Sequence, residues 1–140
     1  MTVESFDPGA EASQLSDASL MRLVEVSATF SEEVQKGETD EALGLTTLER
    51  SSMAGLMTLP AKTWTDAVQA LQTSEIESLI RFLTLAEEAI GGWQAGDKSP
   101  VIALVKVLKS RGSYDRALTR WIKANSDNRF LPHGSLMDRL

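Results

Sequence analysis

The chain has 140 residues, the usual length of a single domain, and its 42% hydrophobic and 24% charged residues are ordinary for a folded protein. It contains no cysteine, which excludes disulfides, thiolate metal sites and cysteine nucleophiles and favours a cytoplasmic location. The N-terminus does not resemble a secretory signal, and the longest apolar stretch, residues 101–108, is interrupted by Lys106 and is too short to span a membrane. We therefore expect a soluble cytoplasmic protein with no membrane partner.

The charge changes sign along the chain. Residues 1–97 hold 5 Lys and Arg against 17 Asp and Glu, a balance of −12, whereas residues 98–140 hold 9 against 3, a balance of +6. This asymmetry suggests an anionic partner for the C-terminal third. The alternative is that the two parts lie side by side and neutralise each other.

The N-terminal region divides into a leader and a helix. Residues 1–15 show no periodic apolar face, so they are predicted to form a mobile leader. Over residues 20–34 apolar side chains recur at helical spacing, which predicts the first helix. That helix is expected to begin at Ser16 or Asp17 and to end at Gly37.

The next segment predicts two further helices. One is expected at about residues 46–58, where Gly55 weakens the pattern and Pro60 ends it. A short helix before Gln72 is predicted by four apolar positions: Trp64, Ala67, Val68 and Leu71.

The clearest amphipathic pattern covers residues 74–90, with Thr73 as the expected N-cap and Gly91-Gly92 as the stop. A helix over residues 100–111 is predicted from Ser99-Pro100, because serine caps free amides and proline suits the first helical position. Its apolar residues cover more than one stripe, which indicates a central helix. β-branched residues there also permit a strand, but the Ser-Pro start favours a helix.

The last helix is expected over residues 114–124, with Ser113 as its cap. Its inward face is predicted to consist of Tyr114, Ala117, Leu118, Trp121 and Ile122. Its opposite face carries Arg116, Arg120 and Lys123. Residues 125–134 have no periodicity and are rich in turn formers, so they predict a loop.

These patterns together predict an all-α fold, a compact bundle of five or six short helices. We expect a mobile N-terminal leader, an irregular C-terminal tail, and a single helical domain over residues 16–140.

The sequence offers little for catalysis or metal binding. Its one histidine, His133, lies near Asp127, and an Asp–His pair is one interpretation, although an exposed turn histidine is the favoured one. The adjacent pairs Glu32-Glu33 and Glu87-Glu88 point to different faces of a helix, and no phosphate-binding or calcium-binding loop is found. We predict no enzyme, no metal and no cofactor.

Two kinds of residue are candidates for binding a partner or an anion. The cations are Lys106, Lys109, Arg116, Arg120, Lys123 and Arg129. The aromatic residues are Trp93, which either plugs the core from a glycine-rich connection or awaits a partner, and Phe130, which either docks on the bundle or binds something else.

The leading hypothesis is a non-catalytic protein-interaction or regulatory module that binds a protein partner or another copy of itself. The alternative is an anion- or nucleic-acid-binding helix-turn-helix, in which residues 114–124 present their cations. Further phosphate contacts are expected from Lys106, Lys109, Arg111 and Arg129. The pI of about 4.8 tells against nucleic acid.

Overall fold

A computed structural model describes residues 15–29 and 44–134 of the chain. Every regular element in these two ranges is a helix, which confirms the all-α prediction. The predicted leader falls outside the described residues except for Leu15, as do the Gly37 stop and residues 135–140. Within the two ranges, none of the helices combines the length and the apolar content that crossing a bilayer requires.

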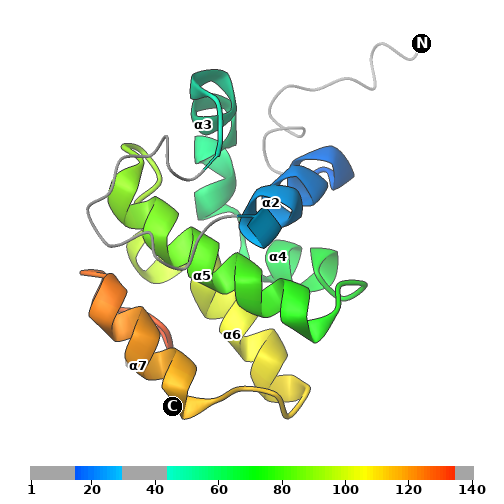
Figure 1. Cartoon of the computed structure of the whole chain (residues 1–140), viewed down its shortest axis with the longest axis vertical. Coiled ribbons are helices and arrows are strands. Elements are labelled where there is room, and N and C mark those ends of the chain that lie inside the picture. The colour runs from blue at the N-terminus through cyan, green and yellow to red at the C-terminus, as the bar shows by residue number, and fades with distance from the viewer. Residues whose placement is uncertain (1–14, 30–43, 135–140) are drawn as a thin grey trace.

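The helices surround α5. In chain order they are α2 Asp17–Thr29, α3 Thr47–Met53, the 3-10 helix η3 Ala54–Thr58, α4 Ala61–Ala67, α5 Thr73–Ala89, the 3-10 helix η4 Gly96–Lys98, α6 Pro100–Ser110 and α7 Arg116–Asn125. Helices α2, α6 and α7 each pack on α5, and α4 packs on α6. Figure 1 shows α5 in the middle of the molecule and α7 along its lower edge.

Two predicted N-caps are wrong by one or two residues. Helix α5 is capped at Gln72 rather than Thr73, because Glu75 accepts a hydrogen bond from the Gln72 amide at 2.8 Å and fixes the first turn one residue earlier. Helix α7 is capped by Asp115 rather than Ser113, since the Asp115 carboxylate reaches the Ala117 amide at 2.8 Å. Of the two caps predicted for the first helix, Ser16 or Asp17, the structure has Ser16, which accepts from the Ser19 amide. The cap predicted at Ser99 is confirmed by the hydrogen bond from the Val101 amide.

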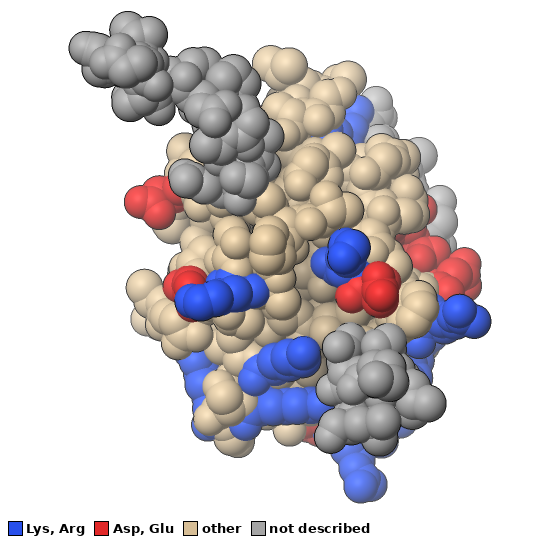
Figure 2. Space-filling view, turned by 180° about the vertical axis from the view of Figure 1, so that it is seen from behind, with Lys and Arg blue, Asp and Glu red and all other residues tan. Residues whose placement is uncertain are grey.

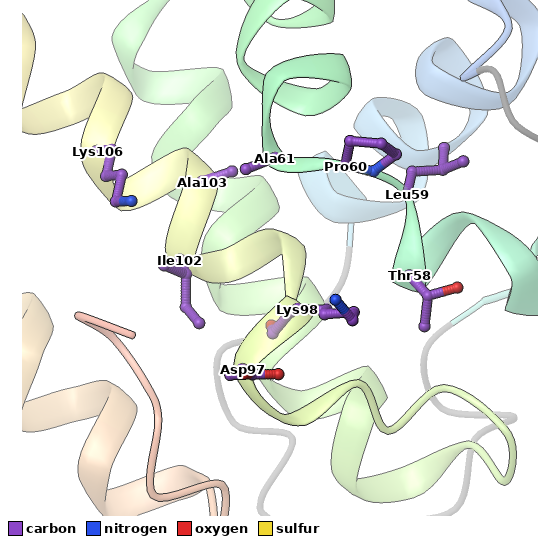
Figure 3. Close-up of a pocket in the computed structure, with 10 residues that line it drawn as sticks. Thr58, Leu59, Pro60, Ala61, Asp97, Lys98, Ile102, Ala103 and Lys106 are labelled. Carbon is purple, nitrogen blue, oxygen red and sulfur yellow. The ribbon is translucent and has the colours of Figure 1, made fainter. Parts of the chain in front are cut away.

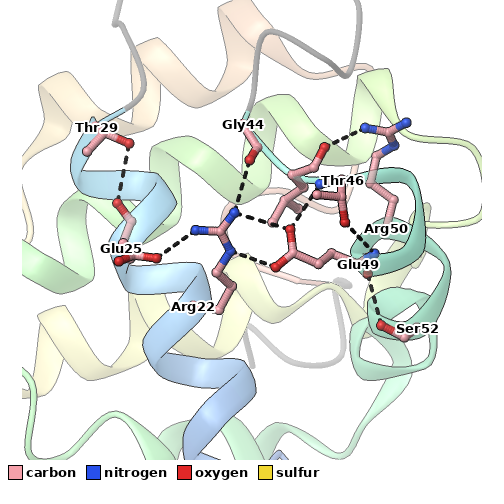
Figure 4. A network of polar contacts seen from close by, with 9 residues as sticks. Arg22, Glu25, Thr29, Gly44, Thr46, Glu49, Arg50 and Ser52 are labelled. Atoms are coloured by element: carbon pink, nitrogen blue, oxygen red, sulfur yellow. Dashed lines mark hydrogen bonds and ion pairs between the residues drawn. The ribbon is translucent and has the colours of Figure 1, made fainter.

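The region predicted as one helix at about 46–58 is divided. Helix α3 begins after a capping box between Thr46 and Glu49 and continues directly into η3 at Ala54. Arg22 of α2 binds the N-terminal end of α3, as Figure 4 shows. Its guanidinium donates to the Glu49 carboxylate at 2.7 Å and to the Gly44 carbonyl at 3.2 Å. The hydrogen bond from Arg22, followed by that from the Thr46 amide, lowers the pKa of Glu49.

The core lies around α5 and α6. All residues of α6 are buried except Lys106, Lys109 and Ser110, which confirms its central position. Trp64 of α4 is fully buried and donates its indole N–H to the Leu56 carbonyl at 3.1 Å. Gly92, at a φ of 91°, and Gly112, at a φ of 72°, turn the chain after α5 and α6 in a region that favours glycine.

The inward face of α7 is narrower than predicted. Leu118 and Ile122 are buried, whereas Tyr114 and Trp121 are half-buried and Ala117 is exposed. Helix α7 packs mainly on α5 at the edge of the bundle, so only a narrow stripe is covered. The guanidinium of Arg81 lies over the Trp121 ring, 5.4 Å from its centroid, at the rim of this contact.

Arg111, proposed above among the phosphate contacts, is instead part of the fold. Its guanidinium donates to the Leu71 carbonyl at 2.9 Å, the Gln69 carbonyl at 3.1 Å and the Thr73 hydroxyl at 3.3 Å. Gln69 and Leu71 lie in the connection between α4 and α5, and Thr73 is the first residue of α5. Arg111 therefore ties that connection to the end of α6.

We expect Arg111→Gln to lower the free energy of unfolding by about 1–3 kcal/mol, because hydrogen bonds from a charged donor to backbone carbonyls are lost. Urea denaturation measures this loss. Lys106→Gln is the matched control, since Lys106 is exposed on α6, and its effect is expected to stay within about 0.5 kcal/mol. Equal effects of the two substitutions would show that the contacts of Arg111 do not stabilise the fold.

Candidate functional site

The predicted cations of α7 form one surface, which we call the α7 basic face: Arg116, Arg120 and Lys123. All three side chains are exposed, and their spacing places them on one side of the helix. Leu118 and Ile122 are buried on the opposite side. None of the three cations forms an ion pair with a residue in the described ranges.

Lys106 does not join this face. It lines a groove between α6 and residues 58–61 at the start of α4, together with Lys98 and apolar residues such as Pro60 and Ile102. The groove has a volume of about 420 Å³, and Figure 3 shows Lys98 and Lys106 along its wall. Figure 2 shows Lys and Arg side chains gathered over the lower half of one face of the molecule, with acidic side chains mainly at mid-height and along its sides.

Two other predicted cations already have contacts. The Lys109 ammonium lies 2.8 Å from Nδ1 of His133 and 5.5 Å from the centroid of the Tyr114 ring. His133 also meets the Tyr114 ring edge-on, at 6.0 Å between centroids. The Arg129 guanidinium lies 5.1 Å from the centroid of the Phe130 ring while remaining exposed. Lys109 of α6 therefore contacts the chain on both sides of α7, at Tyr114 and His133, and Arg129 lies within the loop that follows α7.

The aromatic candidates face inward. Trp93 is fully buried, and its indole N–H donates to the Arg50 carbonyl at 2.9 Å, so it plugs the core and presents no surface to a partner. Phe130 is half-buried against the core, and the neighbouring Leu131 is buried. The loop over residues 125–134 therefore docks on the bundle.

The arrangement of α6 and α7 differs from a helix-turn-helix. In that motif the second helix packs on the first across a short turn. Here α7 packs mainly on α5, and residues 111–115 connect it to α6. Arg111 within this connection is held by backbone carbonyls, so it is not presented to a phosphate.

The structure also contains a polar cluster around the buried Glu87 that the sequence analysis did not predict. We call it the Glu87 cluster, and it comprises Glu87, Glu88, Ser99, Ser126 and Asn128. Glu87 is only 2% exposed. The Ser99 hydroxyl donates to one of its carboxylate oxygens, and the Asn128 amide donates to the other at 3.4 Å.

Glu88 and Asn128 extend this cluster to the loop after α7. The Glu88 carboxylate accepts from the Asp127 amide at 3.0 Å and from the Ser126 hydroxyl at 3.4 Å. Asn128 also donates to the Gly96 carbonyl at 3.0 Å. A hollow of about 320 Å³ beside the cluster is lined by Glu87, Glu88, Gln94, Gly96, Asp127 and Asn128.

Burial raises the pKa of Glu87 to about 7, although the hydrogen bonds from Ser99 and Asn128 act in the opposite direction. The charge of Glu88 raises the pKa further. The carboxyl of Glu87 therefore changes protonation near neutral pH. Among the described residues, no group of three or more His, Cys, Asp or Glu side chains is arranged to hold a metal ion.

One sequence signal points to Glu87. It lies four residues after Leu83 and seven after Ile80, and so continues the apolar stripe of α5. A carboxylate on such a stripe faces the core and needs donors there. When Glu87 and Glu88 are considered only as an adjacent pair, the position of Glu87 on the apolar stripe is overlooked.

Comparison with protein-family models, with curated proteins and with solved structures finds no match for the chain.

Proposed function

We propose that the chain is a non-catalytic protein-interaction module that binds an acidic protein surface through the α7 basic face. The observation that carries the proposal is the exposure of Arg116, Arg120 and Lys123 on one side of α7, with no ion pair to any described residue. Opposite surface charges steer and orient association between proteins. We place the module in the cytoplasm, because the chain contains no cysteine.

The chain itself supplies an acidic surface for such a contact. Residues 1–97 carry a balance of 5 Lys and Arg against 17 Asp and Glu. A second copy can set acidic side chains against the α7 basic face, so self-association is the first form of the proposal to test. An acidic protein surface is favoured over nucleic acid because the whole chain has a net charge of −6 and α7 does not pack as a recognition helix on α6.

The test removes the α7 basic face. In the variant R116Q/R120Q/K123Q, we expect self-association at low salt, measured by sedimentation velocity, to weaken about tenfold or more. Binding of a fluorescent oligoglutamate peptide, measured by anisotropy, is expected to weaken in parallel and to fade in the wild type as salt rises. The fold is expected to survive, since exposed charges contribute only ~0–1 kcal/mol each.

The control variant K62Q/K98Q/K106Q removes the same number of positive charges from α4 and from the groove beside it. It is expected to retain association and peptide binding. Equal weakening in both variants would mean that only net charge matters. Binding to a short DNA duplex alone, with no association and no peptide binding, would replace this proposal by the nucleic-acid alternative.

A further inference from the structure

The Glu87 cluster joins three segments that are distant in the sequence. Glu87 lies in the last turns of α5, Ser99 is the N-cap of α6, and Asn128 lies in the loop that follows α7. Because the hydroxyl of Ser99 also accepts from the Val101 amide, one side chain serves both the helix cap and the carboxyl. The side chain of Glu87 is thus the point at which the loop meets the core.

The loop segment concerned is residues 126–130, which we call the α7 exit loop. It is held by Glu88, through the amide of Asp127, and by the contacts of Asn128 with Glu87 and Gly96. Asn128 also orders the segment internally, since its side-chain oxygen accepts from the Phe130 amide at 3.0 Å. Releasing Asn128 would therefore loosen the whole α7 exit loop.

The charges around Glu87 disfavour its ionised form. Glu88 on α5 and Asp127 on the loop share the hollow with it. Asp97 and Lys98 of η4 are exposed and line the groove beside α6, and neither of them lines this hollow. The first turn of α6 contains no charged side chain. Among the described residues, no cation lines the hollow that the carboxyl of Glu87 shares.

We propose that Glu87 is a proton-controlled clasp, which holds the α7 exit loop on the bundle when its carboxyl is protonated and releases the loop when the carboxyl is ionised. In the closed form the hydrogen bond between Ser99 and Glu87 is reversed: the protonated carboxyl donates to the Ser99 hydroxyl oxygen, and the other carboxyl oxygen still accepts from Asn128. On ionisation the proton passes to water, and the carboxylate gains hydration if the loop moves away and the hollow opens to solvent.

The loop is expected to open at high pH, and not at low pH, because protonation of Glu87 is linked to its burial. The closed cluster binds the proton more tightly than a solvated glutamate does, because burial and Glu88 raise the pKa of Glu87. An opening that hydrates Glu87 restores an ordinary pKa, so it must become more favourable as the pH rises. This device operates at the C-terminal end of α7 and does not depend on what the α7 basic face binds.

The experiment follows the wild-type protein by NMR from about pH 5 to about pH 9. The side-chain carboxyl carbon of Glu87 is expected to titrate with a midpoint near 7. Over the same range the amides of Asp127 and Phe130 are expected to lose protection against hydrogen exchange by about tenfold or more, after correction for the intrinsic rate. Amides in the middle of α6 serve as the internal reference and are expected to show no such transition.

Two variants separate the clasp from a general effect of pH. Glu87→Gln is expected to keep the α7 exit loop protected throughout, because the amide is neutral and can both donate to Ser99 and accept from Asn128. Glu88→Gln is expected to keep the transition but to move its midpoint to lower pH, since the charge of Glu88 raises the pKa of Glu87.

Three results would overturn the proposal. The first is a Glu87 carboxyl that titrates like an ordinary exposed glutamate. The second is a midpoint near 7 with no accompanying change in exchange at Asp127 and Phe130. The third is an unchanged loop transition in Glu87→Gln. The first two need only the wild-type protein, so they decide the matter even if a variant does not fold.

Discussion

Trp93→Ala is expected to lower the free energy of unfolding by about 3–5 kcal/mol, because it empties a fully buried indole site. It also removes the donor to the Arg50 carbonyl, which is bonded to the indole N–H at 2.9 Å. The substitution therefore weakens the contact between the connection after α5 and helix α3. Urea denaturation followed by circular dichroism measures it, and a decrease of this size is a large part of the stability of a domain.

Trp121→Ala is the matched control, with the same change of side chain on α7. Trp121 is half-buried at the edge of the bundle, with Arg81 over its ring, so we expect a loss of less than about 2 kcal/mol. The sequence pattern alone places Trp121 in the core and leaves Trp93 either plugging the core or awaiting a partner, so it does not predict this order of losses. Equal losses, or a larger loss for Trp121, would contradict the burial seen in the structure.

The sequence was sufficient where one local signal determines a helix. Ser99-Pro100 fixes the start of α6, and the apolar residues on more than one stripe identify it as the central helix. Local patterns were insufficient for α7, whose exposed Ala117 and half-buried Trp121 depend on how far α5 extends over it. Periodicity shows which side of a helix faces the core, but the neighbouring helices determine how wide a strip of that side is buried.

For the candidate site too, local sequence patterns predict some features, and others depend on how the helices pack. The outward direction of Arg116 and Arg120 follows from the helical repeat of α7 and could be predicted. The separation of Lys106 from that face could not, because it depends on the packing of α7 on α5 and of α6 on α4. The partners of Glu87 were also out of reach of local patterns, since Asn128 is 41 residues further along the chain.

The stability of the chain is expected to fall as the pH rises through neutrality. Burial raises the pKa of Glu87 to about 7 from an ordinary value of 4.5, so the folded protein binds the proton more tightly than the unfolded chain. The contribution of Glu87 is fully present below pH 4.5 and is lost as the pH passes 7. This difference in pKa corresponds to a loss of up to about 3 kcal/mol in the free energy of unfolding.

The control for this prediction is Glu87→Gln, measured by urea denaturation at the same series of pH values. The difference in unfolding free energy between wild type and variant isolates Glu87, because other titrating groups are common to both proteins. The lowered pKa of Glu49 acts in the opposite sense, since its stabilisation is present above its unfolded pKa and is lost in acid, below the range in which Glu87 titrates. We therefore expect the wild type to lose stability relative to Glu87→Gln between about pH 5 and about pH 8. A difference that is constant over this range would show that the Glu87 carboxyl is not held by burial, because a glutamate that titrates alike in the folded and unfolded chain adds no dependence on pH.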